Sequence, residues 1–400
     1  MREHNNFKYT CLFGGGAMRG AAHVGVLKAL NDLGIELTTL AGSSVGSMVA
    51  ALCAVGYTPD EIAEVFLSVN FELFRDISFG FNQKFAISKG EVFLDWIREL
   101  IERKFYGDKY VKGQCEKVFF KDLNKNLVVI TTNLKNCSAK EFSTFETPEF
   151  EVAMAVRISC CMPGLMRALT VDDELLVDGD LMKGKPMWSL SKHLKNADDR
   201  ILEIRLEGSV PASNQSPLEY VNGMYTCMTS AETSFIKSIF GKQDKFDFLV
   251  IDTGNVVVID FNHPVDKRQE IIDSGYRQTK DYFLNYLVLK KQKIHDVYSE
   301  ILDKLRHAQS LFLLKKYIAA KNIISELFVY LCATEKVVDN DITEALLLFH
   351  KLVVANVKKG LLGRESCVNI DTVRNTLHSI IDDLTLRVKE LESYLNKFSD

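Results

Sequence analysis

The N-terminal part of the chain repeats one pattern twice: a short apolar run, a glycine-containing turn and a helical stretch. Residues 8–13 (KYTCLF) predict a buried strand, and after Gly14–Gly16 the segment 18–33 carries apolar residues at helical spacing. Residues 35–41 predict a second strand, which GSSVG and the apolar segment 48–55 follow. Strands that alternate with helices in this way form a mostly parallel sheet covered by helices. The sequence therefore predicts an α/β fold.

This alternation continues to about residue 286 and then stops. Further strands are predicted at 126–132, 173–177, 200–206, 246–252 and 255–261, and further helices at 59–70, 90–105, 148–157 and 266–286. Beyond that point the segments 287–332, 341–359 and 371–398 are helical in pattern, and the last has an apolar seam at three- and four-residue steps. We therefore predict one domain over residues 7–285 and an all-α C-terminal module over 286–400.

The composition is that of an ordinary folded protein. Of 400 residues, 47% are hydrophobic and 26% charged, and the formal net charge of −4 argues against a protein held to nucleic acid by phosphate contacts. No apolar run reaches about 18 residues, so no transmembrane helix is expected, and the N-terminus lacks the features of a secretory signal. Nine scattered cysteines without a CxxC pair favour reduced thiols in the cytoplasm over disulfides or structural zinc.

A glycine-rich run, GGGAMRG, lies between the first predicted strand and the first helix. Glycines at this point let backbone N–H groups approach an anion closely. Arg19 stands where the third glycine of a dinucleotide fingerprint should fall, and the Gly-Lys-Ser/Thr of a Walker loop is absent. On this run alone, a nucleotide phosphate loop, an oxyanion hole and a tight structural turn remain alternatives.

The run Gly42-Ser43-Ser44-Val45-Gly46 matches G-x-S-x-G between a predicted strand and an apolar helix. In a nucleophile elbow the central serine sits on a sharp turn there, with its Oγ exposed above the sheet. Ser44 takes that position, and Ser43 is expected to support the turn.

A nucleophilic serine needs a base, and the usual base is histidine. None of the eight histidines sits at a predicted strand end, so structural or surface roles are the default for His4, His23, His193, His263, His295, His307, His350 and His378. Asp178, in VDGD after the predicted strand 173–177, lies instead at a carboxyl-terminal strand end, where α/β sheets gather active sites. The alternative for this Asp-Gly pair is an ordinary turn.

Taken in this order, the motifs resemble the patatin-like phospholipase family. The matching pieces are GGGAMRG with AAHVGVLKAL, then GSSVG, then AVRISCCMPGLM leading into LLVDGD, and finally IIDSGYRQT. The resemblance covers about residues 7–285 and implies a three-layer α/β/α sandwich with a Ser–Asp dyad, no histidine base, no metal and no cofactor.

Carried onto this sequence, the resemblance implies a nucleophile at Ser44, which Asp178 activates. The oxyanion hole would be formed by backbone N–H groups of Gly15, Gly16 and Ala17. Supporting positions are Arg19, which would steady the site or meet the charge of the substrate, and Gly14, Gly42, Gly46 and Gly179.

Two residues depart from the pattern of the family. Asp180 stands where Gly or Ala usually follows the Asp-Gly pair, and this second carboxylate would either repel Asp178 or face solvent. Ala17 replaces a fourth glycine that many members carry, although its N–H is retained.

The resemblance implies a phospholipid or lysophospholipid ester as substrate. Apolar residues beside two lysines predict a lid, a membrane-touching edge or a packed surface helix; they are Phe235, Ile236, Ile239 and Phe240 with Lys237 and Lys242. The terminal seam is expected to pack in a bundle or to form a homodimer. Two other readings of the whole chain remain open, a lipid acyltransferase and an inactive scaffold whose helices bind a partner.

Overall fold

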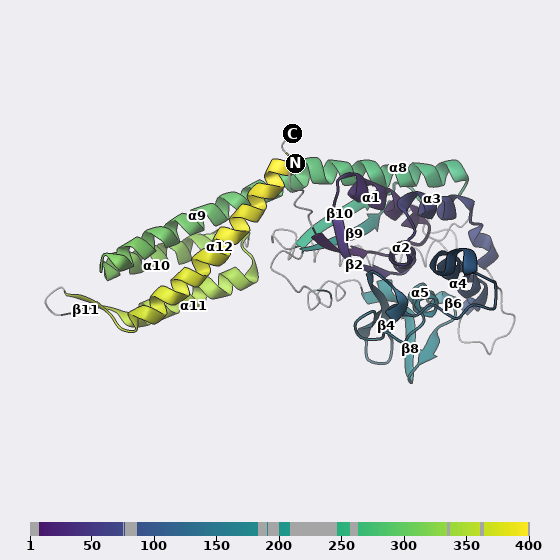
Figure 1. The fold of residues 1–400 in the computed structure, drawn as a ribbon, viewed down its shortest axis with the longest axis horizontal. Coiled ribbons are helices and arrows are strands. Elements are labelled where there is room, and N and C mark those ends of the chain that lie inside the picture. Colours follow the sequence, from purple (N-terminus) through teal and green to yellow (C-terminus); the bar gives the residue numbers. More distant parts are fainter. Residues whose placement is uncertain are drawn as a thin grey trace, which may run out of the picture. The chain divides into compact units, whose positions relative to one another are not determined.

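The computed structural model in Figure 1 describes residues 8–74, 76, 86–182, 190, 200–208, 246–256, 263–333, 337–360 and 364–398. The chain divides into two compact units. The first contains the sheet and ends at Tyr282, and the second consists mainly of the helices from Phe283 onward. The stretch with Phe235 and Phe240, the residue His193 and most of the predicted strand 255–261 lie outside the described residues.

The first unit is built around an eight-stranded sheet in the order β10–β9–β1–β2–β4–β8–β7, with β5 paired to β4 outside this path. Four strands form its parallel centre in the order β9–β1–β2–β4, and they are β1 (Lys8–Phe13), β2 (Glu36–Ser43), β4 (Asn126–Asn133) and β9 (Arg200–Glu207). These strands are buried along most of their length, and β9 buries the charged residues Arg200, Glu203 and Arg205 among its apolar ones.

The remaining strands extend this centre at its two edges. Next to β4 the pairing is antiparallel, through β5 (Ser138–Ser143), β7 (Leu169–Val171) and β8 (Glu174–Asp178). At the other edge lies β10 (Phe246–Asp252), and a separate short parallel pair joins β3 (Ala86–Ser88) to β6 (Gly164–Met166).

Two groups of helices flank the sheet (Figure 1). One consists of α1 (Ala21–Asp32), α3 (Pro59–Ser68) and α8 (Val265–Asp281), and the other of α2 (Val45–Val55), α4 (Glu91–Tyr106) and α5 (Val152–Ser159). Short 3-10 turns lie at η1 (Ala17–Gly20), η2 (Phe71–Phe74), η3 (Gly107–Lys109), η4 (Phe120–Asp122) and η5 (Gly179–Met182). The predicted α/β sandwich with a mostly parallel sheet is confirmed.

Helices α1 and α8 pack backbone against backbone. A Cβ atom added at Gly25 would lie 1.9 Å from the carbonyl oxygen of Ile272, and one at Gly275 would lie 2.2 Å from that of Ala22. Since real Cβ atoms do not approach so closely, both glycines are needed for this contact. The segment IIDSGYRQT therefore joins the end of the first unit to its first helix.

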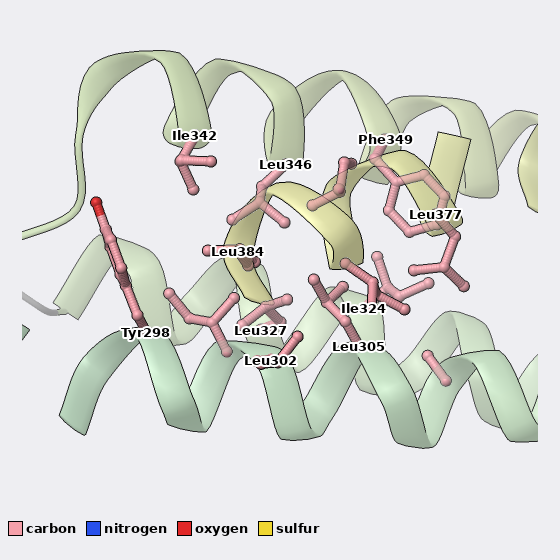
Figure 2. Close-up of a cluster of buried hydrophobic side chains, with 14 of the residues drawn as sticks. Tyr298, Leu302, Leu305, Ile324, Leu327, Ile342, Leu346, Phe349, Leu377 and Leu384 are labelled. Carbon is pink, nitrogen blue, oxygen red and sulfur yellow. The ribbon is translucent and has the colours of Figure 1, made fainter. Parts of the chain in front are cut away.

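The second unit contains four long helices: α9 (Leu287–Leu313), α10 (Tyr317–Ala333), α11 (Asn340–Asn356) and α12 (Ile370–Phe398). Figure 2 shows their apolar side chains pointing into one shared core, among them Tyr298, Ile324, Phe349 and Leu377. The predicted helical character is confirmed. A short antiparallel pair of strands, β11 (Val357–Lys359) and β12 (Glu365–Cys367), was not foreseen. Among the described helices, none is both long and apolar enough to cross a bilayer.

Candidate active site

Ser44 occupies a strained turn between β2 and α2. Its backbone has φ 50° and ψ −131°, in the positive-φ region that side chains rarely adopt. The turn is held on both sides, because Ser44 N–H donates to Ser159 Oγ at 2.9 Å and Ser47 Oγ donates to Ser44 O at 2.6 Å. A serine in this conformation at the start of a helix has the geometry of a nucleophile elbow.

The two flanking glycines make this turn sterically feasible. A Cβ at Gly42 would lie 2.4 Å from the carbonyl carbon of Gly46, and a Cβ at Gly46 would lie 2.1 Å from the carbonyl oxygen of Phe13. The elbow therefore packs directly on its own backbone and on the end of β1. Both glycines of G-x-S-x-G are therefore required here, because a side chain at either position would overlap the backbone.

The side chains of Ser44 and Asp178 are in hydrogen-bond contact. Ser44 Oγ donates to Asp178 Oδ2 at 2.7 Å, and the two residues are 5% and 0% exposed. The second oxygen, Oδ1, accepts from the backbone N–H of Asp180 at 2.8 Å, while Asp178 N–H donates to Cys161 O at 2.9 Å. The carboxylate is thus oriented by its own chain on one side and by the serine on the other.

Sheet register explains how residues 134 positions apart meet. Ser43, at the end of β2, pairs with Ile130 on β4, and the next residue of β4, Thr131, pairs with Asp178 on β8. Strand β4 thus lies between the two catalytic candidates and aligns them. Because β8 runs antiparallel to β4, Asp178 does not owe its place to the shared carboxyl edge of parallel strands on which the sequence argument relied.

Among the described residues, no imidazole contacts the side chain of Ser44. His23, on α1, is completely buried, and its Nε2 lies 2.7 Å from the carbonyl oxygen of Gly14. Burial lowers the pKa of His23 to about 4, although the hydrogen bond to Gly14 opposes this shift. The ring is therefore neutral near pH 7, and Nε2–H is the donor, since a carbonyl oxygen only accepts. His23 anchors the glycine loop.

The glycine loop connects β1 to η1, and its residues make different contacts. Gly14 N–H donates to Ile204 O on β9 at 2.9 Å, and Gly15 N–H donates to Asp180 Oδ1 at 3.0 Å. The N–H groups of Gly16 and Ala17 have no acceptor among the described residues. In this structure the Gly15 N–H is engaged by a carboxylate, so a substrate oxygen would have to displace Asp180 Oδ1 to accept from it.

Arg19 is buried in η1 beside this loop. Its exposed fraction is 4%, and its Nε donates to the carbonyl oxygen of Val256 at 3.0 Å. A Cβ at Gly208 would lie 2.9 Å from the Arg19 guanidinium carbon, so this side chain also packs tightly. Of the two predicted roles, this position favours steadying the site.

Asp180 is 1% exposed, so the expectation that it faces solvent is wrong. Its Oδ1 accepts both the Gly15 N–H and the Ser43 hydroxyl, the latter at 3.1 Å. Gly179 before it is also required, because a Cβ there would lie 2.1 Å from the carbonyl oxygen of Ile130. The VDGD segment therefore contributes two buried carboxyl groups with different partners.

Sequence reasoning missed Ser159, at the end of α5. Its Oγ donates to Ile130 O at 2.6 Å and accepts the Ser44 N–H, which ties the elbow to β4. No spacing rule singles out this serine within AVRISCC. Among the described residues, no group of three or more His, Cys, Asp or Glu side chains is arranged to hold a metal ion.

Comparison with known proteins agrees with this architecture. Residues 12–190 match the family model of patatin-like phospholipases. Protein R571 of Acanthamoeba polyphaga mimivirus is 26% identical over 292 residues, which cover 68% of this chain and 93% of that protein. The probable lipid hydrolase 463L of Invertebrate iridescent virus 6 is 24% identical over 178 residues, 44% of this chain and 61% of that protein.

Among solved structures, VipD from Legionella pneumophila aligns with a TM-score of 0.49 at 14% identity, covering 97% of this chain and 90% of VipD. The family assignment depends on the sequence match and on the fold described above. Residues 12–190 therefore carry a patatin-like phospholipase domain, the region that the family model matches.

Proposed function

We propose that this protein is a serine acyl hydrolase that cleaves acyl esters of lipids through a Ser44–Asp178 dyad. The observation that carries the proposal is the 2.7 Å hydrogen bond from Ser44 Oγ to Asp178 Oδ2, made by a serine on a strained elbow. A nucleophile within hydrogen-bond reach of a base, which a third group orients, is the arrangement that covalent catalysis requires. Here the backbone N–H of Asp180 orients the base.

In the proposed reaction, Asp178 accepts the hydroxyl proton as Ser44 Oγ attacks the ester carbonyl carbon. The negative charge that develops on the carbonyl oxygen is stabilised by the N–H groups of Gly16 and Ala17. Loss of one such donor typically costs about 2.7–4 kcal/mol of transition-state stabilisation. Asp178 then passes the proton to the departing alcohol, and water releases the acyl group from Ser44 by the same steps in reverse order.

The substrate class follows from the family rather than from a shaped pocket. Patatin-like phospholipases act on lipid esters, and a relative bears the name probable lipid hydrolase. We therefore propose a glycerophospholipid or lysophospholipid as substrate. A cytoplasmic location with transient membrane contact belongs to the same proposal, as does a homodimer through the helical unit.

Labelling with a fluorophosphonate probe and hydrolysis of an ester panel test the dyad together. Ser44→Ala should remove both labelling and hydrolysis, whereas Asp178→Asn should keep the hydroxyl and slow both reactions by at least about 100-fold. Ser379→Ala, an exposed serine on α12, is the matched control and should behave as wild type.

Retained hydrolysis in folded Ser44→Ala would refute the proposal. Adding glycerol or a lysolipid acceptor to the same assay identifies an acyltransferase, because the acyl group would then appear on the acceptor instead of as free acid.

A further inference from the structure

The side chain of Asp180 has no role in the reaction proposed above, although it lies beside the dyad. The residue follows Asp178 and Gly179 in η5 and is 1% exposed. A carboxyl group is costly to bury unless hydrogen bonds compensate for the lost water. The contacts that provide this compensation indicate what the residue does.

These contacts link three separate parts of the site. Oδ1 of Asp180 accepts the Gly15 N–H at 3.0 Å from the glycine loop and the Ser43 hydroxyl at 3.1 Å from the end of β2. The backbone N–H of Asp180 donates to Oδ1 of Asp178 at 2.8 Å. One residue thus joins the oxyanion loop, the strand that presents the nucleophile and the proposed base.

The contact with Gly15 is close enough to restrict that position to glycine. A Cβ on Gly15 would lie 2.5 Å from Cγ of Asp180 and 2.6 Å from its Oδ2. The carboxyl group therefore fills the space that a side chain at position 15 would need. The glycine is required here because of Asp180 and not only because of a ligand.

Beyond Gly15, the loop adopts a conformation that it would not keep unaided. Gly16 has φ 152°, and Ala17 has φ 44°, in the left-handed region that disfavours a residue with a Cβ. Such conformations persist only where the surroundings hold them. Ile204 and His23 hold Gly14, and Asp180 holds the next residue, immediately before the two N–H groups that lack an acceptor among the described residues.

We propose that Asp180 is a positioning residue that holds the glycine loop against the elbow, so that the N–H groups of Gly16 and Ala17 stay within reach of the substrate oxyanion. The inference rests on the proposed function, since it assigns Asp180 a role in that reaction. Its basis is that one oxygen, Asp180 Oδ1, accepts hydrogen bonds from both the loop residue Gly15 and the elbow residue Ser43. In this role the Asp180 side chain acts through the loop.

The test compares Asp180→Ala with Asp180→Asn on a soluble ester substrate. Asp180→Ala removes the acceptor, so kcat should fall by about 100-fold while KM changes by less than about threefold. Asp180→Asn keeps an Oδ1 acceptor and should recover most of the lost kcat. Ser43→Ala leaves the Gly15 contact in place and should lose less than Asp180→Ala. The exposed Asp266 on α8 provides matched controls, Asp266→Ala and Asp266→Asn, which should match wild type.

Amide hydrogen exchange at Gly15 gives a readout that does not need activity. The Gly15 amide should exchange faster in Asp180→Ala than in wild type, and Asp180→Asn should restore its protection. If Asp180→Ala does not fold, Asp180→Ser replaces it, because serine lacks the Oδ1 atom that accepts the Gly15 N–H.

The outcomes separate the two proposals. Wild-type kcat in Asp180→Ala, with Ser44→Ala inactive, would overturn the role of Asp180 and leave the proposed function standing. Equal losses in Asp180→Asn and Asp180→Ala would overturn it in favour of a role for the charge. If wild type neither hydrolyses esters nor reacts with the fluorophosphonate probe, the proposed function fails. In that case the Gly15 amide still tests the loop contact, because an unchanged exchange rate in Asp180→Ala would refute it.

Discussion

The elbow region and the helical unit should respond differently to amino-acid substitution, because different kinds of packing hold them together. Around Ser44, backbone packs on backbone, so that a single added Cβ at Gly42, Gly46 or Gly179 would overlap a main-chain atom. In the helical unit, apolar side chains from α9, α10, α11 and α12 share one core, and Figure 2 shows part of it. Changes there alter volume, which neighbouring side chains can partly absorb. The comparison separates positions that fix geometry from positions that supply stability.

One polar network in the helical unit depends on exact geometry and not on packed volume. Arg387 on α12 donates to Asp339 at 2.9 Å and to Asp341 at 2.7 Å, and Tyr298 on α9 donates to the same Asp339 oxygen at 3.0 Å. Arg387 and Asp339 are buried, so the network fixes how α9, α11 and α12 align. Like the site around Ser44, this network depends on particular hydrogen-bond partners, but it determines the alignment of helices and takes no part in the proposed reaction.

Gly46→Ala gives the strongest test of the geometric side of the comparison. Its Cβ would lie 2.1 Å from Phe13 O, so the elbow must shift. We expect ester hydrolysis to fall by at least about 100-fold, and the free energy of unfolding to fall by about 1–3 kcal/mol. Gly360→Ala is the control, because its Cβ would meet its nearest atom only at 3.4 Å. Kinetics near wild type for Gly46→Ala would show that the overlap does not govern the elbow.

Leu377→Ala tests the other side of the comparison. Leu377 is fully buried in the helical core, so its truncation should cost about 2–5 kcal/mol of stability by chemical denaturation. Under conditions where the protein stays folded, kcat should remain that of wild type. Leu386→Ala on the same helix is the control, since that side chain is 47% exposed. A large drop in kcat for folded Leu377→Ala would contradict the separation of stability from geometry.

His23 should make the stability of the first unit sensitive to acid. Its pKa is about 4 in the folded protein against an ordinary value of 6.5, so the unfolded chain binds the proton first as the pH falls. Stability should therefore decline below about pH 6.5, by about 2 kcal/mol near pH 5. His23→Gln keeps an N–H donor without titrating and should flatten this part of the profile. Urea unfolding at a series of pH values measures this dependence, and His378→Gln, at an exposed position on α12, is the control. If the free energy of unfolding falls with pH equally steeply in His23→Gln and in wild type, His23 is not the cause.

The sequence was most informative where steric rules leave few choices. The glycines of GGGAMRG and GSSVG lie in turns where the structure shows overlap or positive φ, and the elbow follows from that spacing. Pairing Ser44 with Asp178 needed the family resemblance, because no local pattern relates residues 134 positions apart. Their contact depends on the register of β4 with both neighbouring strands.

The antiparallel direction of β8 follows from a tight turn that the sequence analysis did not identify. Asp172 and Asp173, with φ values of 50° and 62°, form a two-residue turn between β7 and β8. Consecutive positive-φ residues between short apolar runs are typical of a tight hairpin. Ser159 and the acceptor role of Asp180 had no comparable signal, since each depends on which elements pack together. Strands β11 and β12 span only three residues each, too few to show a period.

The overlap between Gly15 and Asp180 has an evolutionary consequence. A related chain with alanine at position 15 cannot also keep a carboxylate at position 180 in this geometry, because both would claim the same volume. The two positions should therefore vary as a pair among relatives. If both residues are replaced during evolution, Asp180 should be replaced by a smaller residue before Gly15 is replaced by a larger one.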